Sequence, residues 1–143
     1  MADSNALPRR LAQAGAWLFA AGMITGLWAA AVLTGRIAVP IPRLALAAHL
    51  NGILGGLWLI AVAWTVPLLR YGDRGLGRFA ALVAVAAWAN WLITLAASVL
   101  GVRGLEYTGN GANDAVALLL QVFVVLPSLI GAVAWAWGFG ARR

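Results

Sequence analysis

The residues that could do chemistry are few in this chain of 143 residues, which has one histidine and no cysteine. The histidine, His49, lies in the apolar stretch RLALAAHLNGILGGLWLIAVAW, which begins at Arg43. An imidazole in such surroundings can make a hydrogen bond to another helix, relay a proton, or ligate a metal or a haem iron. A relay needs further ionisable partners, and the apolar stretches contain no Asp, Glu or Lys. The hydrogen bond and the ligand are therefore the two stronger interpretations from the residues alone.

The other polar side chains in the apolar stretches are amides and hydroxyls. Asn90 and Thr94 are four residues apart, so on a helix they form a polar strip on one face beside small residues. Such groups can orient a substrate, but they are poor general acids or bases. The hydroxyls of Ser98 and Ser128 are expected to make hydrogen bonds within or between helices.

Glycines and tryptophans surround these polar residues. On a helix, Gly52 and Gly56 share the face of His49 and leave a shallow groove that could accept a partner helix or a flat ligand. Asn51 and Gly55 fall on a different face of the same helix. The tryptophans that lie deep enough in the apolar stretches to line a pocket are Trp28, Trp58, Trp88 and Trp91.

Four long apolar segments position these residues, and the composition is that of a membrane protein, with 64% hydrophobic and 10% charged residues. Each segment exceeds the roughly 20 residues that a helix needs to cross a bilayer. Because backbone groups in lipid must be satisfied internally, we expect an all-α transmembrane four-helix bundle that forms one domain over residues 1–143. The predicted helices cover about residues 11–34, 44–69, 79–101 and 115–139.

The ten arginines predict the orientation of this bundle. Seven of them lie in the N-terminal arm, the middle loop and the C-terminus, whereas the other two loops hold Arg36, Arg43 and Arg103. The positive-inside rule therefore predicts cytoplasmic termini in a multi-pass protein of the cytoplasmic (inner) membrane. The arginines occur singly or in pairs, so the net charge of +6 does not indicate nucleic-acid binding. At the start of the fourth helix, Asn113 and Asp114 are expected to form the cap.

The order and spacing of several short motifs resemble the small four-helix membrane family of hydroxylaminobenzene mutases and styrene oxide isomerases. The likeness spans nearly the whole chain. The segments PRLALAAHL and ANW are similar to the mutase branch in particular. The motifs are GLW at 26–28, the Pro-Arg before the second helix, His49 followed seven residues later by Gly56, Asn90 in WAN, and NDAV at 113–116.

This resemblance implies a homotrimer that holds haem b between neighbouring subunits. His49 would be the axial ligand of the haem iron, which acts as a Lewis acid on the substrate oxygen. Asn90 would lie beside the substrate, with Thr94 supporting it. The residues expected to contact the haem are Gly52 and Gly56, with Arg43 and Arg103 at its propionates. The residues expected to line the substrate pocket are Asn51, Gly55, Trp28, Trp88 and Trp91.

Two residues depart from the pattern of the family. Gly55 stands six residues after the histidine, where asparagine is usual, and an asparagine is displaced to Asn51. Thr94 stands where the isomerase branch has tyrosine.

The resemblance to the mutase branch predicts an enzyme of aromatic compound metabolism that rearranges a small aromatic hydroxylamine to an aminophenol. The alternative activity is the isomerisation of an epoxide to an aldehyde, as in the styrene oxide branch.

A non-enzymatic haem-binding subunit for electron transfer, or a transport subunit, is the rival class of function. A b-type cytochrome of four helices commonly uses two axial histidines per haem, and this chain has one. A transporter would more often have internal repeats or broken, charged helices at mid-membrane, and the sequence has neither pattern. Both features favour the enzyme.

Overall fold

The computed structural model describes residues 6–140, and these residues form helices and loops without a strand. Each of the four spans is long and apolar enough to cross a membrane. The protein is therefore an all-α, multi-pass membrane protein, as the sequence predicted. The first three spans are α1 (Ala6–Leu33), α2 (Pro42–Thr65) with the short 3-10 turn η1 (Val66–Leu68), and α3 (Asp73–Leu100). The fourth span consists of α4 (Gly111–Leu120), the π-helical segment η2 (Gln121–Val125) and α5 (Leu126–Gly138).

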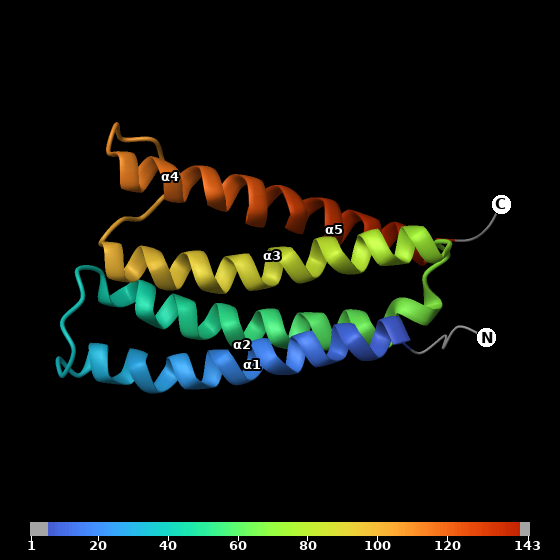
Figure 1. The fold of residues 1–143 in the computed structure, drawn as a ribbon, viewed down its shortest axis with the longest axis horizontal. Coiled ribbons are helices and arrows are strands. Elements are labelled where there is room, and N and C mark those ends of the chain that lie inside the picture. Colours follow the sequence, from blue (N-terminus) through green and yellow to red (C-terminus); the bar gives the residue numbers. More distant parts are fainter. Residues whose placement is uncertain (1–5, 141–143) are drawn as a thin grey trace.

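The spans follow one another side by side in chain order (Figure 1). The first residues of α1 and the last residues of α5 lie at the same end of the molecule. α2 packs against both α1 and α3, whereas the fourth span packs against α3. The core that joins the first three spans is built from fully buried apolar side chains such as Leu18, Leu59, Val62 and Val83.

The helices begin earlier than the apolar segments do. α1 includes Arg9 and Arg10, and α3 begins at Asp73 rather than near residue 79. Hydropathy marks the part of a helix that lies in hydrocarbon, and polar residues can extend the same helix into the headgroup region. An acidic residue in the first turn, such as Asp73, also interacts favourably with the helix dipole.

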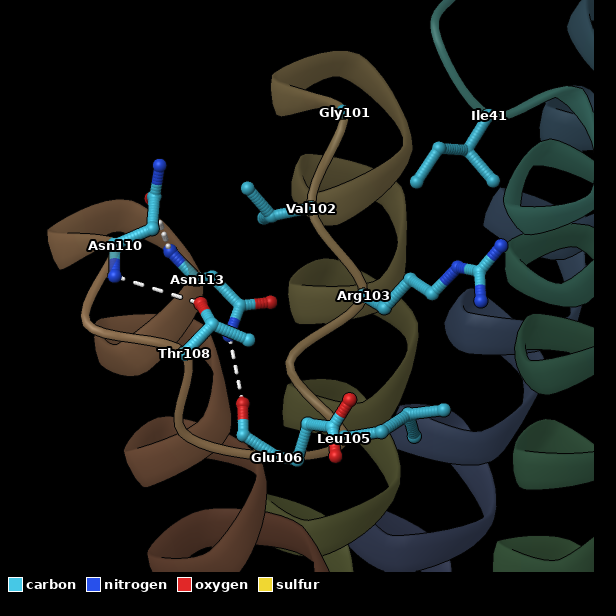
Figure 2. Close-up of a pocket in the computed structure, with 9 residues that line it drawn as sticks. All are labelled: Ile41, Gly101, Val102, Arg103, Leu105, Glu106, Thr108, Asn110 and Asn113. Carbon is cyan, nitrogen blue, oxygen red and sulfur yellow. Dashed lines mark hydrogen bonds between the residues drawn. The ribbon is translucent and has the colours of Figure 1, made fainter.

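The cap of the fourth span lies one turn earlier than the sequence predicted. The side chain of Asn110 accepts hydrogen bonds from the backbone N–H groups of Ala112 and Asn113, each at 3.1 Å. The two residues predicted to form the cap, Asn113 and Asp114, instead make hydrogen bonds to the loop that precedes the helix. Asn113 donates to the Glu106 carbonyl at 2.7 Å (Figure 2), and Asp114 accepts from the backbone of residues 108 and 109.

Glycines bring the backbones of α1 and α2 into direct contact, and we call this contact the glycine seam (Gly15, Gly22, Gly52 and Gly56). A Cβ atom added at Gly22 would lie 2.6 Å from the backbone nitrogen of Ile53. A Cβ atom at Gly56 would lie 2.7 Å from the carbonyl oxygen of Gly15. The sequence left open whether a partner helix or a flat ligand packs on Gly52 and Gly56, and in the structure the helix α1 packs there. A planar cofactor cannot lie on these two glycines, because α1 fills the groove.

The π-helical segment of the fourth span has a clear cause in Pro127. Proline lacks a backbone N–H and its ring clashes with the carbonyl four residues earlier, here that of Phe123. The chain avoids the clash with a wider turn, in which the N–H of Leu126 bonds to the carbonyl of Gln121, five residues back. The extra residue changes the direction in which the following helix α5 presents Ser128.

Candidate functional site

His49 lies against α1, which fixes the orientation of its ring. The Nδ1 atom is 2.8 Å from the carbonyl oxygen of Gly22. Because a carbonyl oxygen can only accept, Nδ1 must donate, and the neutral imidazole then has its lone pair on Nε2. Gly26 provides the space for the ring, since a Cβ atom at this position would lie 2.6 Å from Cε1 of His49. The sequence did not identify Gly22 and Gly26 as partners of the histidine.

The second ring nitrogen of His49 is free. Nε2 makes no hydrogen bond to any residue that the structure describes. Every buried polar side-chain atom of these residues has a hydrogen-bond partner, so an atom without a partner is not buried. Nε2 therefore reaches the surface of the molecule. Asn51, two residues further and thus about 200° around the helix, faces α3. The imidazole of His49, packed against α1, therefore lies on another side of α2 than the Asn51 amide.

This arrangement fits an axial haem ligand. Histidines that ligate metals commonly donate their other ring N–H to a backbone carbonyl or a carboxylate, which fixes the tautomer and raises the basicity of the ligating nitrogen. The residues that the structure describes contain no group of three or more His, Cys, Asp or Glu side chains that could hold a bare metal ion. One imidazole suits an iron whose other ligands come from a porphyrin.

The amide of Asn51 joins α2 to the polar strip of α3. Its Nδ2 atom donates to Oδ1 of Asn90 at 3.2 Å and to Oγ1 of Thr94 at 3.0 Å. All three side chains are half-buried. The structure thus brings together three residues that the sequence had assigned to the site.

A cavity of about 290 Å³ lies between α2, α3 and α5, next to this cluster. Asn90 and Ser128 are its only polar lining residues among those that the structure describes. The cavity contains no imidazole, carboxylate or amine in its lining, so it can bind and orient a molecule but cannot supply a general acid or base. Its size is near the lower end of the roughly 300–1,000 Å³ of ligand pockets, which suits a single aromatic ring. The apolar lining residues are Leu54, Gly55, Trp58, Val83, Ala86, Ala87 and Ala132.

Gly55 keeps this cavity open on the α2 side. A Cβ atom at this position would lie 3.1 Å from Cδ2 of Leu18 and 3.5 Å from Cβ of Ala87. A larger residue would therefore have to extend into the cavity or displace Leu18. Gly55 thus borders this cavity, and its place in a substrate pocket stays a prediction.

The predicted tryptophans lie elsewhere. Trp28 and Trp91 line a groove of about 510 Å³ between α1 and α3. Trp91 donates from Nε1 to Oγ1 of Thr25 at 3.0 Å, and Trp88 contacts Trp91 edge to face, with 5.8 Å between the ring centroids. The structure therefore does not bring these three tryptophans to the cavity of Asn90. Trp58, which the sequence had also left available to line a pocket, lines that cavity, and its spacing of seven residues from Asn51 places it on the same face of α2.

The predicted haem-propionate partners lie near the end of the bundle at which α2 begins and α3 ends. Arg43 is exposed in the first turn of α2. Arg103 lines a cavity of about 360 Å³ at the loop that follows α3, and its side chain extends toward Ile41 rather than toward Asn110 (Figure 2). Their contact with a propionate stays a prediction.

Two comparisons with known proteins match most of this chain. The hydroxylaminobenzene mutase HabB of Ectopseudomonas oleovorans is 29% identical over 139 residues, which cover 92% of this chain and 80% of the relative. The family model described as styrene oxide isomerase matches residues 7–140. Both descriptions are those of isomerases or mutases, so the protein is an enzyme of this class. With a match over almost its whole length and four membrane-spanning helices, the chain belongs to the styrene oxide isomerase family.

Proposed function

We propose that this membrane enzyme rearranges a small aromatic hydroxylamine to an aminophenol without a net change of redox state. The cavity of Asn90 is the observation that carries the proposal, because it combines apolar walls with an amide and has no ionisable lining residue. The relative HabB, whose name is that of a hydroxylaminobenzene mutase, supports this reaction over the isomerisation of an epoxide.

The reaction requires little acid or base from the protein. The N–O bond of the hydroxylamine breaks, a C–O bond forms on the ring, and the proton that leaves this ring carbon ends on the nitrogen. Reactant and product therefore have the same composition, and no reductant is consumed. Asn90 would hold the oxygen as it moves, with Thr94 supporting it through the Asn51 amide, which donates to both. The face of Trp58 and the apolar walls would stabilise positive charge on the ring and keep water away.

His49 is the residue that we propose as the ligand of a haem b. The iron of such a haem would supply a Lewis acid that weakens the N–O bond. Gly22 would hold the imidazole in the ligating tautomer through its carbonyl oxygen, 2.8 Å from Nδ1. Arg43 and Arg103 would pair with the haem carboxylates at the edge of the membrane.

We further propose that the enzyme works as a homotrimer. Nε2 of His49 and the cavity of Asn90 open on different flanks of one chain, so a substrate that contacts both groups would lie between neighbouring copies. A haem shared in this way also agrees with the resemblance described above. The arginine distribution supports a cytoplasmic membrane location with both termini in the cytoplasm.

The test uses detergent-purified protein from haem-sufficient cells, phenylhydroxylamine and no added reductant. We expect an aminophenol that retains an ¹⁸O label from the hydroxylamine, and a Soret band that is lost in His49→Ala together with the activity. Thr34→Ala is the control, since Thr34 bonds only to its own helix. A colourless preparation that converts neither phenylhydroxylamine nor styrene oxide would refute the proposal, whereas conversion of styrene oxide alone would favour the epoxide reaction.

A further inference from the structure

We infer that Asn51 is a positioning residue that fixes which end of the Asn90 amide faces the cavity, and that it thereby makes the cavity a hydrogen-bond donor to an oxygen of the ligand. The inference deepens the proposed function and rests on it, because it specifies the polarity that the pocket offers to the substrate. Asn51 itself does not line the cavity.

The geometry of the cluster assigns the roles of its polar atoms. The Nδ2 atom of Asn51 has two hydrogens, and the structure directs them to Oδ1 of Asn90 at 3.2 Å and to Oγ1 of Thr94 at 3.0 Å. The two acceptors lie one helical turn apart on α3, so one NH₂ group can reach both. Asn51 thus uses both of its donors within the pair of helices.

The consequence for Asn90 is that its oxygen is occupied and its nitrogen is free. Nδ2 of Asn90 makes no hydrogen bond to any residue that the structure describes. Since every buried polar side-chain atom of these residues has a hydrogen-bond partner, Nδ2 of Asn90 is not buried. This nitrogen therefore reaches open space. Since Asn90 lines the cavity, the NH₂ group is the part of the amide that a bound molecule would meet.

The NH₂ group of Asn90, with the Ser128 hydroxyl as the other polar group of the lining, favours one class of ligand. An oxygen attached directly or through one atom to a single ring can accept from Nδ2 of Asn90, while the ring lies against Trp58 and Val83. A ligand of the same shape without an acceptor would leave this NH₂ group desolvated and unpaired, which lowers its affinity.

The orientation of the Asn51 amide decides the polarity of the cavity. If the Asn51 amide were reversed, its oxygen would accept from Asn90, and the oxygen of Asn90 would then face the cavity. Position 51 therefore controls whether the pocket donates or accepts. Removal of the Asn51 amide would leave Asn90 free to take either orientation.

The experiment compares benzaldehyde with styrene, two rings with the same number of heavy atoms that differ in an oxygen against a methylene. Binding to the purified, haem-loaded protein is measured by titration of the tryptophan fluorescence. We expect benzaldehyde to bind about tenfold more tightly than styrene, as one hydrogen bond in an apolar site predicts. In Asn51→Ala, where Asn90 can take either orientation, the ratio should fall about twofold, to roughly fivefold, with the affinity for styrene unchanged.

The matched control is Thr25→Val, which removes another hydrogen bond between helices, the one from Trp91 to Thr25 on the opposite flank. It should leave the ratio of the two affinities unchanged. A second measurement keeps the test valid if Asn51→Ala does not fold. In protein with ¹⁵N-labelled asparagine, the side-chain NH₂ signal that Asn90→Ser removes should shift with benzaldehyde and not with styrene.

The outcomes separate this inference from the proposed function. Equal binding of the two ligands by the unmodified protein would overturn the inference, and so would a tenfold preference that persists in Asn51→Ala, since the preference would then arise at another group. Turnover of phenylhydroxylamine on the same preparation is scored separately. Turnover without the preference would retain the function and refute the inference, whereas an Asn51-dependent preference without turnover would do the reverse.

Discussion

The contact between α1 and α2 and the contact between α3 and α5 both join apolar helices, but they are built differently. In the glycine seam, a Cβ atom at Gly22 would meet the backbone of Gly52 and Ile53 within 2.7 Å. On the other side, a Cβ atom at Gly131 of α5 would meet only Cγ1 of Val83, at 2.9 Å. The first contact is therefore made by backbone on backbone, and the second by side chains.

The two contacts therefore have different roles in the site. Backbones in contact cannot separate without loss of the fold, so the seam can hold His49 in one orientation. Side chains can change their rotamers and leave space, so the contact with α5 can border the cavity of Asn90. The rigid contact thus positions the proposed haem ligand, and the adjustable contact shapes the proposed substrate pocket.

The largest expected effect comes from adding one methyl group to the seam. Gly22→Ala should destabilise the protein by about 1–3 kcal/mol, because backbone atoms must move to accept the Cβ atom. The same change at Gly131 should cost less, since its Cβ atom would meet a single side-chain atom, Cγ1 of Val83, rather than backbone, and alanine favours the helix by up to about 1 kcal/mol. Thermal unfolding in detergent, followed by size-exclusion chromatography, measures both. Equal destabilisation by the two variants would show that the two contacts are alike.

A smaller effect is expected from a substitution that weakens haem binding and leaves the cavity of Asn90 unchanged. Gly26→Ala places a Cβ atom 2.6 Å from Cε1 of His49, so the ring must move away from the Gly22 carbonyl. We expect about 10–100-fold weaker haem retention, as for other losses of a partner that orients a ligand. Haem retention is measured by the decay of the Soret band in the presence of apomyoglobin.

Gly55→Ala is the matched variant for this prediction. Its Cβ atom would lie 3.1 Å from the end of the Leu18 side chain and would narrow the cavity. The Soret band should therefore stay unchanged while the KM for phenylhydroxylamine rises a few-fold. A change of the Soret band in Gly55→Ala without one in Gly26→Ala would contradict the division of tasks.

The smallest expected effect lies in the loop before the fourth span. Asn110→Ala removes the side chain that caps α4, and the loss of a cap costs about 1 kcal/mol. Asn110→Asp should retain the stability, because a carboxylate accepts the same two hydrogen bonds. The activity should be unaffected in both variants, since Asn110 does not line the cavity of Asn90. A loss of turnover with unchanged stability would place the loop in the site instead.

The sequence predicted the parts of this molecule that depend on depth and periodicity. The four spans follow from hydropathy, and the pairing of Asn90 with Thr94 follows from a spacing of four residues. The sequence could not show which neighbouring helix each side chain faces. In a membrane, side chains that face lipid and side chains that face protein are equally apolar. For this reason Trp28, Trp88 and Trp91 were assigned to a substrate pocket, whereas Trp58 is the tryptophan that lines the cavity of Asn90 among the residues that the structure describes. The occupant of the glycine seam depends on tertiary contacts, whereas the cap at Asn110 is local, because its side chain accepts from the N–H groups two and three residues later.

The π-helical segment has a consequence for how such a pocket can change. It contains one residue more than an α-helix of the same rise would need, and this residue sets the direction of Ser128 and Ala132 in the wall of the cavity. Deleting one residue from Gln121–Val125 would turn these two side chains by about 100° without altering any residue of the other helices. Insertion or deletion in this segment is thus a route by which homologues can acquire differently shaped pockets on one scaffold.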